Sequence, residues 1–382
     1  MSILFESITI KNMELRNRFV RSATYDGSAE INGCVSERQM KLFTDLAEGG
    51  VGLIITGIVY THPSGRISPF QNSLASDDVI PGFQKLTKAM HERGTGVAVQ
   101  LFHAGREGAK LFNLMKEKAV APSVVDDDPY FTGDYRALAE EEIWDIVHSF
   151  GDAAKRARAA GFDAVQIHGA HAYLISEFLS PFSNRRNDRW GGELTNRLRI
   201  HKEICNDIKA KAGDDYPVLI KLGVEDGFPG GLQFTEGLEA AGLCAEWGYD
   251  GLEISQGLRG EEFSGTEFRT KINKVEQEAY FRQWSKEVRK LVTVPVMMVG
   301  GLRTFELMEE VVQNGEADFV SLSRPFIREP GLVKSWENGS RRRATCISCN
   351  KCIGAMFRGV PLQCIYEKEL AERAREKQAQ PS

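Results

Sequence analysis

Eight short apolar segments recur along the chain, and each is followed by a segment with helical periodicity. We predict β-strands at residues 17–23, 51–56, 96–102, 163–168, 216–222, 250–255, 294–300 and 318–323. Most of these segments are continuous apolar runs, which is typical of parallel strands that are covered on both faces. Eight strands that alternate with helices predict an α/β fold of the (β/α)8 TIM-barrel class.

The segments between the strands have the pattern of amphipathic helices. Residues 140–161 carry apolar side chains at three- to four-residue spacing, acidic side chains in the first turn, and Gly161 as a stop signal. Residues 197–213 and 305–315 behave in the same way. We therefore expect helices that cover the outside of the barrel.

Two segments depart from a plain barrel. Residues 103–139 follow the third strand and are rich in Asp, Pro, Gly and Lys, and a long excursion there can cap the mouth of a barrel. The last segment holds four cysteines and a Glu/Lys/Arg-rich tail, for which we expect a helix that frays at its end. We predict a barrel domain over 1–340 and a short Cys-rich extension with a C-terminal tail over 341–382, packed on the barrel.

The composition argues against several classes of protein. The 48 basic and 53 acidic residues are interspersed and leave a formal charge of −5, so no basic face indicates nucleic acid. No segment approaches the roughly 20 apolar residues of a membrane span, and the first residues lack the pattern of a secretory signal. We therefore expect a cytoplasmic protein that binds a small-molecule substrate and neither nucleic acid nor a membrane.

The seventh and eighth predicted strands end in a pattern that is typical of a phosphate site. Gly300 and Gly301 follow the seventh strand, and Ser323 and Arg324 follow the eighth. Backbone N–H groups at a glycine pair can approach an anion, and these two loops are the usual phosphate grip of this barrel class. A tight turn without a ligand is the alternative for the glycine pair, but Arg324 in the adjacent loop favours the phosphate site.

Residues 166–192, QIHGAHAYLISEFLSPFSNRRNDRWGG, place His168 at the end of the fourth strand, and His171 and Tyr173 follow within five residues. Two neutral imidazoles could both donate to one oxygen and polarise a carbonyl or nitro group, while a nearby phenol delivers a proton to the adjacent carbon. The pair could also bind zinc, although no carboxylate or third histidine is clearly placed to complete that site. A purely structural role is the third alternative.

Two further strand ends carry polar side chains that suit a heterocyclic ligand. Gln100 offers a donor and an acceptor to the edge of a heterocycle. Lys221 ends an apolar run, so it must reach the mouth of the barrel or be paired, because an isolated buried ammonium is costly. At the mouth, it could place positive charge beside an electron-rich ring.

Taken together, these motifs resemble the old yellow enzyme family of FMN-dependent oxidoreductases over about residues 1–340. HGAHAYLISEFLSPFSNRRNDRWGG and VQLFHAGR carry the resemblance, and NRFVRSA and VSLSRPFIREP agree with it in order and spacing. The resemblance implies FMN held noncovalently in the mouth of a barrel. It also implies an ene-reductase, in which NADH or NADPH reduces FMN and hydride passes to the activated C=C bond of an α,β-unsaturated carbonyl compound.

The resemblance further implies a role for individual residues. Tyr173 would be the proton donor, and His168 and His171 would bind the substrate oxygen. The residues implied for FMN are Gln100 at the pyrimidine edge, Ala23, Thr24 and Gly57 along the ring system, Lys221 near N1, and Gly300, Gly301, Ser323 and Arg324 at the phosphate. Lys221 stands where arginine is common, and Tyr25 where cysteine or threonine is common, which implies altered redox tuning and a changed pocket shape.

Four cysteines near the end of the chain form the pattern C-x2-C-x2-C-x11-C, namely Cys346, Cys349, Cys352 and Cys364. The spacing suits a [4Fe–4S] cluster, and zinc or unliganded thiols are the alternatives. The segment resembles the iron–sulfur segment of the trimethylamine dehydrogenase and 2,4-dienoyl-CoA reductase branch, and Asn350 strengthens the likeness. In that branch the cluster relays electrons from further C-terminal domains, which we expect to be absent because the sequence ends at residue 382.

The source of electrons and the reaction therefore stay open between several hypotheses. A separate electron-transfer partner could reduce the protein, or nicotinamide could reduce FMN directly, or the cysteines could be a remnant. The second enzymatic hypothesis is an amine or ether dehydrogenase, or a dienoyl-thioester reductase core, that uses the cluster as an electron port. The others are an electron-transfer subunit, which would not need Tyr173, and a non-redox lyase or aldolase. Homo-oligomers are common among similar proteins, but the sequence defines no interface.

Overall fold

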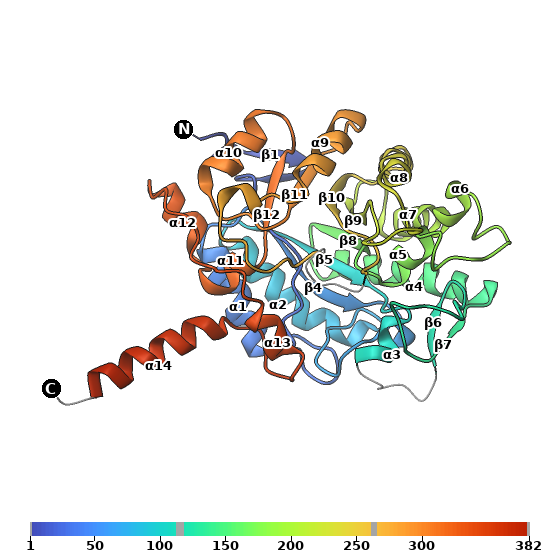
Figure 1. The fold of residues 1–382 in the computed structure, drawn as a ribbon, viewed down its shortest axis with the longest axis horizontal. Helices are drawn as coiled ribbons and strands as arrows, with labels where there is room; N and C mark the ends of the chain where they lie inside the picture. Colours follow the sequence, from blue (N-terminus) through green and yellow to red (C-terminus); the bar gives the residue numbers. More distant parts are fainter. Residues whose placement is uncertain (1, 112–117, 261–265, 380–382) are drawn as a thin grey trace.

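The computed structural model describes residues 2–111, 118–260 and 266–379, and its centre is a closed barrel of parallel strands (Figure 1). The barrel strands are β3 (Phe19–Arg21), β4 (Leu53–Tyr60), β5 (Gly96–Phe102), β8 (Ala164–Gly169), β9 (Val218–Gly223), β10 (Gly251–Ser255), β11 (Val296–Val299) and β12 (Phe319–Leu322). Each barrel strand pairs with the next one along the chain, and β12 pairs with β3. The predicted (β/α)8 barrel is confirmed, and every predicted strand overlaps an observed one.

Helices surround the barrel and bury the outer faces of its strands (Figure 1). They are α1 (Glu37–Glu48), α2 (Ile80–His91), α4 (Glu140–Ala159), α5 (Leu174–Leu179), α6 (Leu194–Arg197), α7 (Arg199–Ala212), α8 (Phe234–Glu246), α9 (Arg282–Leu291), α10 (Phe305–Gln313), α11 (Arg324–Arg328) and α12 (Leu332–Glu337). Helix α4 begins with three glutamates and stops before Gly161, whose φ of 84° suits glycine. The three predicted helices are therefore confirmed.

A hairpin that the sequence analysis missed closes the amino-terminal end of the barrel. Strands β1 (Ile8–Ile10) and β2 (Met13–Leu15) pair in an antiparallel ladder. The hairpin contributes Ile10, Met13 and Leu15 to an apolar cluster. The barrel strands contribute residues near their beginnings, namely Val20, Leu53, Ala98, Ala164, Leu219, Met297 and Phe319. Strands of three residues are too short to show periodicity in a sequence.

The excursion after β5 contains α3 (Glu107–Leu111) and the parallel pair β6 (Ala119–Ala121) and β7 (Tyr135–Ala137). A buried ion pair between Arg106 and Asp128 holds it. The Arg106 backbone N–H also donates to Glu177 of α5 over 3.1 Å. Residues 112–117 of the predicted excursion lie outside the described part of the chain.

The C-terminal segment lies against the carboxyl ends of the barrel strands. Helix α13 (Lys351–Met356) contributes to this packing, and the Leu362 N–H donates to the Asp26 carbonyl over 2.8 Å. Helix α14 (Ile365–Ala379) then projects away from the barrel (Figure 1), and the last three residues of the expected frayed helix lie outside the description. Across the described ranges, no helix combines the length and apolar character that crossing a membrane would need.

We expect Trp336→Ala to destabilise the fold strongly. Trp336 of α12 is fully buried, with ring centroids 5.5 Å from Phe19 and 5.7 Å from Phe305. Loss of a buried tryptophan should lower the free energy of unfolding by about 3–5 kcal/mol. Denaturant unfolding followed by circular dichroism measures the change. Leu291→Ala, at a side chain that is 53% exposed, is the control and should change stability by less than about 0.5 kcal/mol.

Candidate active site

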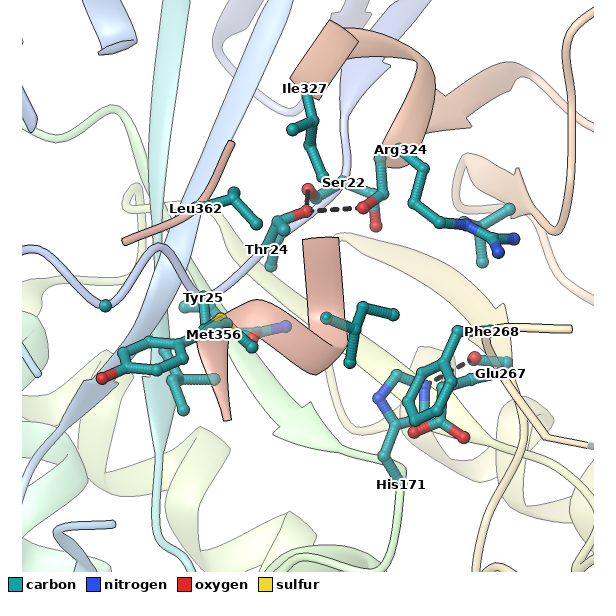
Figure 2. Close-up of a pocket in the computed structure, with 18 of the residues that line it drawn as sticks. Ser22, Thr24, Tyr25, His171, Glu267, Phe268, Arg324, Ile327, Met356 and Leu362 are labelled. Carbon is teal, nitrogen blue, oxygen red and sulfur yellow. Dashed lines mark hydrogen bonds between the residues drawn. The ribbon is translucent and has the colours of Figure 1, made fainter. Parts of the chain in front are cut away.

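One cavity of about 390 Å³ lies at the carboxyl ends of the barrel strands, a volume in the range of small-molecule sites. The predicted residues that line it are Ala23, Thr24, Gln100, His168, His171, Tyr173, Lys221, Gly301, Ser323 and Arg324. Figure 2 shows that Met356 and Leu362 of the C-terminal segment line it as well. The barrel and the Cys-rich extension therefore build this cavity together.

Two predicted glycines shape the cavity from behind and do not line it. At Gly57, an added Cβ would lie 2.8 Å from the Thr24 carbonyl oxygen, so only glycine allows this close approach between β4 and the loop after β3. Gly300 has a φ of 133° and Gly301 a φ of 75°, values that side chains rarely adopt. Gly57 and Gly300 therefore determine the path of the backbone around the cavity.

The two predicted histidines lie side by side with distinct hydrogen bonding. Their ring centroids are 5.0 Å apart and the rings are nearly perpendicular, at 86°. His171 Nε2 is 2.8 Å from Ser255 Oγ. His168 Nδ1 is buried, and no described residue bonds to it. His168 lines the cavity, so its imidazole lies where a ligand can contact it.

Burial lowers the pKa of both imidazoles well below the usual range, and positive charge nearby adds to the effect. For His168, the cationic contributors are Lys221 and Arg259, and the neighbouring His171 acts in the same direction. Both histidines are therefore neutral near pH 7. A neutral imidazole carries one N–H donor, which can bind a carbonyl oxygen.

A strained turn delivers Tyr173 to the histidine pair. His171 and Ala172 both have a φ of 63°, in the left-handed region, which costs on the order of 1 kcal/mol for each residue. The His171 N–H donates to the Gln256 carbonyl over 3.1 Å and holds the turn. The Tyr173 ring then packs 4.5 Å from Phe102 and 5.0 Å from His168, measured between centroids. Burial raises the pKa of Tyr173, so the phenol keeps its proton at neutral pH.

A chain of buried polar side chains crosses the barrel beneath the cavity. Gln100 Nε2 donates to Gln166 Oε1 over 2.8 Å, and Gln166 Nε2 donates to Glu253 Oε2 over 3.0 Å. Lys221 Nζ lies 3.2 Å from the same Glu253 oxygen and donates to Ser22 Oγ over 2.8 Å. Lys221 is therefore paired as well as lining the cavity. The chain holds Gln100 and Lys221 in fixed orientations.

The predicted phosphate end contains a cation that the sequence analysis missed. Arg324 Nη1 donates to the Arg269 carbonyl and to Asn350 Oδ1, over 2.8 and 2.6 Å. Arg303 also lines the cavity, and its buried Nε and Nη2 have no hydrogen-bond partner among the described residues. An anion could satisfy both groups. The sequence could have revealed this cation, because Arg303 follows the Gly300-Gly301 pair by two positions.

Three charged residues beside Tyr173 were also missed, because they come from two segments that are far from Tyr173 in the sequence. Arg259 and Glu267 follow β10, and Glu107 belongs to α3. All three line the cavity. Figure 2 labels Glu267 together with Phe268 and His171 among the side chains that line the cavity. No spacing in the sequence relates these residues to one another.

The four cysteines line a second, smaller cavity, which shares Arg324 and Ile327 with the large one. Within the described chain, no group of three or more His, Cys, Asp and Glu side chains is arranged to hold a metal ion. A zinc ion needs thiolates that converge on one atom at about 2.3 Å. In a [4Fe–4S] cluster each thiolate binds its own iron, so the thiolates surround a volume. The smaller cavity brings together the four side chains that either kind of site would need.

Comparison with known proteins agrees with this geometry. Residues 3–342 match the model of the NADH:flavin oxidoreductase / NADH oxidase family. The chain belongs to this family. The prediction of a flavin oxidoreductase from the resemblance is therefore confirmed, and with it FMN and NAD(P)H as the reagents of the family.

Individual relatives of this flavin oxidoreductase differ in length. It is 34% identical to an NADH oxidase of Thermoanaerobacter brockii over 94% of this chain but only 55% of that protein, so it spans about half of that relative. It is 34% identical to an NADPH dehydrogenase of Bacillus subtilis over 87% of this chain and 93% of that protein. The structure of 2-naphthoyl-CoA reductase, 26% identical, superposes with a TM-score of 0.86 over 95% of this chain and 56% of that one.

We expect His168 and His171 to stay neutral through the pH range in which histidines usually titrate. NMR of histidine-labelled protein should show that neither ring takes up a proton near pH 6.5, which is about the ordinary pKa of histidine. His91 is the internal control, because its hydrogen bond to Asp163 raises its pKa and it should titrate above that value. Protonation of either cavity histidine near pH 6.5 would contradict the neutral pair.

Proposed function

We propose that this flavin oxidoreductase reduces the activated C=C bond of α,β-unsaturated carbonyl compounds with electrons from NADH or NADPH. The observation that carries the proposal is the placement of a protonated phenol, Tyr173, beside two neutral imidazoles in one cavity. Such a group can bind an oxygen and protonate a carbon of the same substrate. An electron-transfer subunit would need neither function.

The cavity has side chains suited to FMN at both ends. Gln100 and Lys221 would meet the polar edge of the ring system, and Ala23 and Thr24 would line it. Gly301 and Ser323 would approach the phosphate, and the unpaired donors of Arg303 would neutralise it together with Arg324. Bound FMN supplies the hydride chemistry between nicotinamide and substrate.

The protein's own residues perform the polar half of the reaction. His168 and His171 donate N–H groups to the carbonyl oxygen and stabilise the negative charge that develops there as hydride reaches the β-carbon. Tyr173 gives its proton to the α-carbon, so one hydride and one proton saturate the double bond. The phenolate that remains regains a proton from solvent before the next turnover.

A second candidate function uses the cysteines as an electron port. The four thiols surround one cavity, and Arg324 and Ile327 separate it from the large cavity. Cys349 is exposed, so an external carrier could approach this side of the protein. In this scheme a [4Fe–4S] cluster receives or passes electrons for a dehydrogenase or a thioester reductase. It is compatible with the same chemistry at Tyr173.

Tyr173→Phe separates the two half-reactions. The variant should reduce FMN with NAD(P)H at a rate within about twofold of the parent. It should lose roughly 10²–10⁴-fold in the rate at which an enone reoxidises the reduced enzyme, because it lacks the general acid. Anaerobic stopped-flow measures both rates. An enone rate unchanged in the variant would refute Tyr173 as the proton donor.

Tyr216→Phe is the matched control, because Tyr216 is also buried and hydrogen-bonded but does not line the cavity. It should leave both half-reactions unchanged. The cofactor itself has a simpler test, which is the visible spectrum of purified protein. A colourless chain that takes up no added FMN would refute the whole proposal.

We expect anaerobically purified protein to contain about four iron atoms and matching acid-labile sulfide per FMN. Cys349→Ser should lose most of the iron while FMN content is retained, because this residue lines only the smaller cavity. Cys34→Ser, outside that cavity, is the control and should keep its iron. Iron at trace level in the parent, or zinc in its place, would reject the cluster.

A further inference from the structure

Arg259 lies over the ring of the proposed proton donor. Its guanidinium carbon is 5.6 Å from the centroid of Tyr173 and 5.8 Å from that of Phe268. The side chain is 19% exposed, so water screens it only in part. A guanidinium does not lose its proton in proteins. Tyr173 therefore faces a permanent positive charge at close range.

Two carboxylates hold Arg259 in this position. Arg259 Nε and Nη2 lie 2.9 and 2.7 Å from one oxygen of Glu267, and Nη1 lies 3.6 Å from Glu107. Each carboxylate side chain is 8% exposed. The contacts fix the guanidinium plane against the phenol ring, since arginine offers donors in a rigid fork.

The other groups near Tyr173 carry no charge at neutral pH. His168 on β8 faces the ring and is kept neutral by burial, as is His171. Tyr25, from the loop after β3, shares an apolar cluster with Tyr173, and burial raises its pKa to about 12. Arg259 and its two carboxylates are therefore the charges that act on Tyr173 from the loops above the cavity.

The signs of these charges oppose one another. Burial, the largest effect, raises the pKa of Tyr173, Arg259 lowers it, and Glu107 and Glu267 raise it. A unit charge at this separation in a partly buried site shifts a pKa by on the order of one unit. Without Arg259, Tyr173 would face two carboxylates and no cation among the described residues that act on it.

We propose that Arg259 is a positioning residue for proton transfer, which holds the Tyr173 ring in place and makes its phenol proton easier to release to the substrate. Glu107 and Glu267 set how much of the guanidinium charge reaches the phenol. The inference rests on the proposed function, in which Tyr173 is the proton donor. It adds three residues to the site that no sequence motif contains.

The test places a fluorinated tyrosine at position 173, because its more acidic phenol titrates where the protein is stable. Titration by ¹⁹F NMR reports that phenol directly and needs no turnover. Arg259→Met should raise the titration midpoint by about one pH unit, and Glu267→Gln should lower it by a similar amount. Arg259→Lys, which keeps the charge, should restore most of the parent value.

The same substitutions in the protein with natural tyrosine provide the second readout. Arg259→Met should slow enone-driven reoxidation at neutral pH by up to about tenfold, which is the largest rate change that one pKa unit of driving force can produce. Arg259→Lys should recover most of that rate. If Arg259 had only a structural role, Arg259→Met and Glu267→Gln would not shift the titration midpoint at position 173 in opposite directions.

Arg158→Met is the matched control, because Arg158 lies 5.6 Å over Tyr216 and pairs with Asp215 but does not line the cavity. It should leave the midpoint at position 173 and the reoxidation rate unchanged. A midpoint at position 173 that Arg259→Met does not move overturns the inference even if enones are reduced. A parent enzyme that reduces no enone overturns the proposed function, whichever way the midpoint moves.

Discussion

Closure of the barrel by the pairing of β12 with β3 is the constraint on which the whole site depends. The ladder joins Val320 to Phe19 and Leu322 to Arg21, residues from opposite ends of the barrel sequence. It brings Thr24 Oγ1 within 2.8 Å of Ser323 Oγ. Because all barrel strands run in parallel, their carboxyl ends meet at one rim, and the loops that follow them enclose one cavity.

Buried charge at this rim is paired, and the few buried polar atoms without a hydrogen bond are the groups that a ligand could satisfy. Lys221 is matched by Glu253, and Arg259 by Glu107 and Glu267. A buried ion pair adds little net stability, but breaking it leaves an uncompensated charge, which costs several kcal/mol. These ion pairs therefore fix the orientation of the side chains more than they stabilise the fold. Arg303, which is ion-paired with Glu278, and His168 each keep buried ring or guanidinium nitrogens without a hydrogen bond to the described residues. They lie at different strand ends, where an anion and a carbonyl oxygen would be held in this proposal.

The Cys-rich extension contributes residues to the site and is hydrogen-bonded to the barrel loops around it. Asn350 accepts a hydrogen bond from Arg324 and donates to the Phe268 carbonyl, so it joins the extension to two barrel loops. Arg303 donates to the Cys346 carbonyl. A change of charge in the smaller cavity would therefore act on side chains that also line the larger one. The two proposed functions share this physical link.

The sequence by itself determined the barrel and the local part of the site. Continuous apolar runs indicated the eight strands. His168, His171 and Tyr173 could be selected together because His168 lies near the end of β8 and the other two follow within five residues. Tertiary structure alone decided which other charges join them. Glu107 lies in the excursion after β5, Glu253 in β10, and Arg259 and Glu267 in the loop after β10. The contacts of these residues with one another and with Lys221 depend on the folded barrel and on the excursion. The hairpin of β1 and β2 escaped detection because three residues show no period, whereas Arg303 was overlooked although its position after the glycine pair was visible. Hydrophobic periodicity records which face of a segment is buried, but it carries no information about which distant charge will lie opposite.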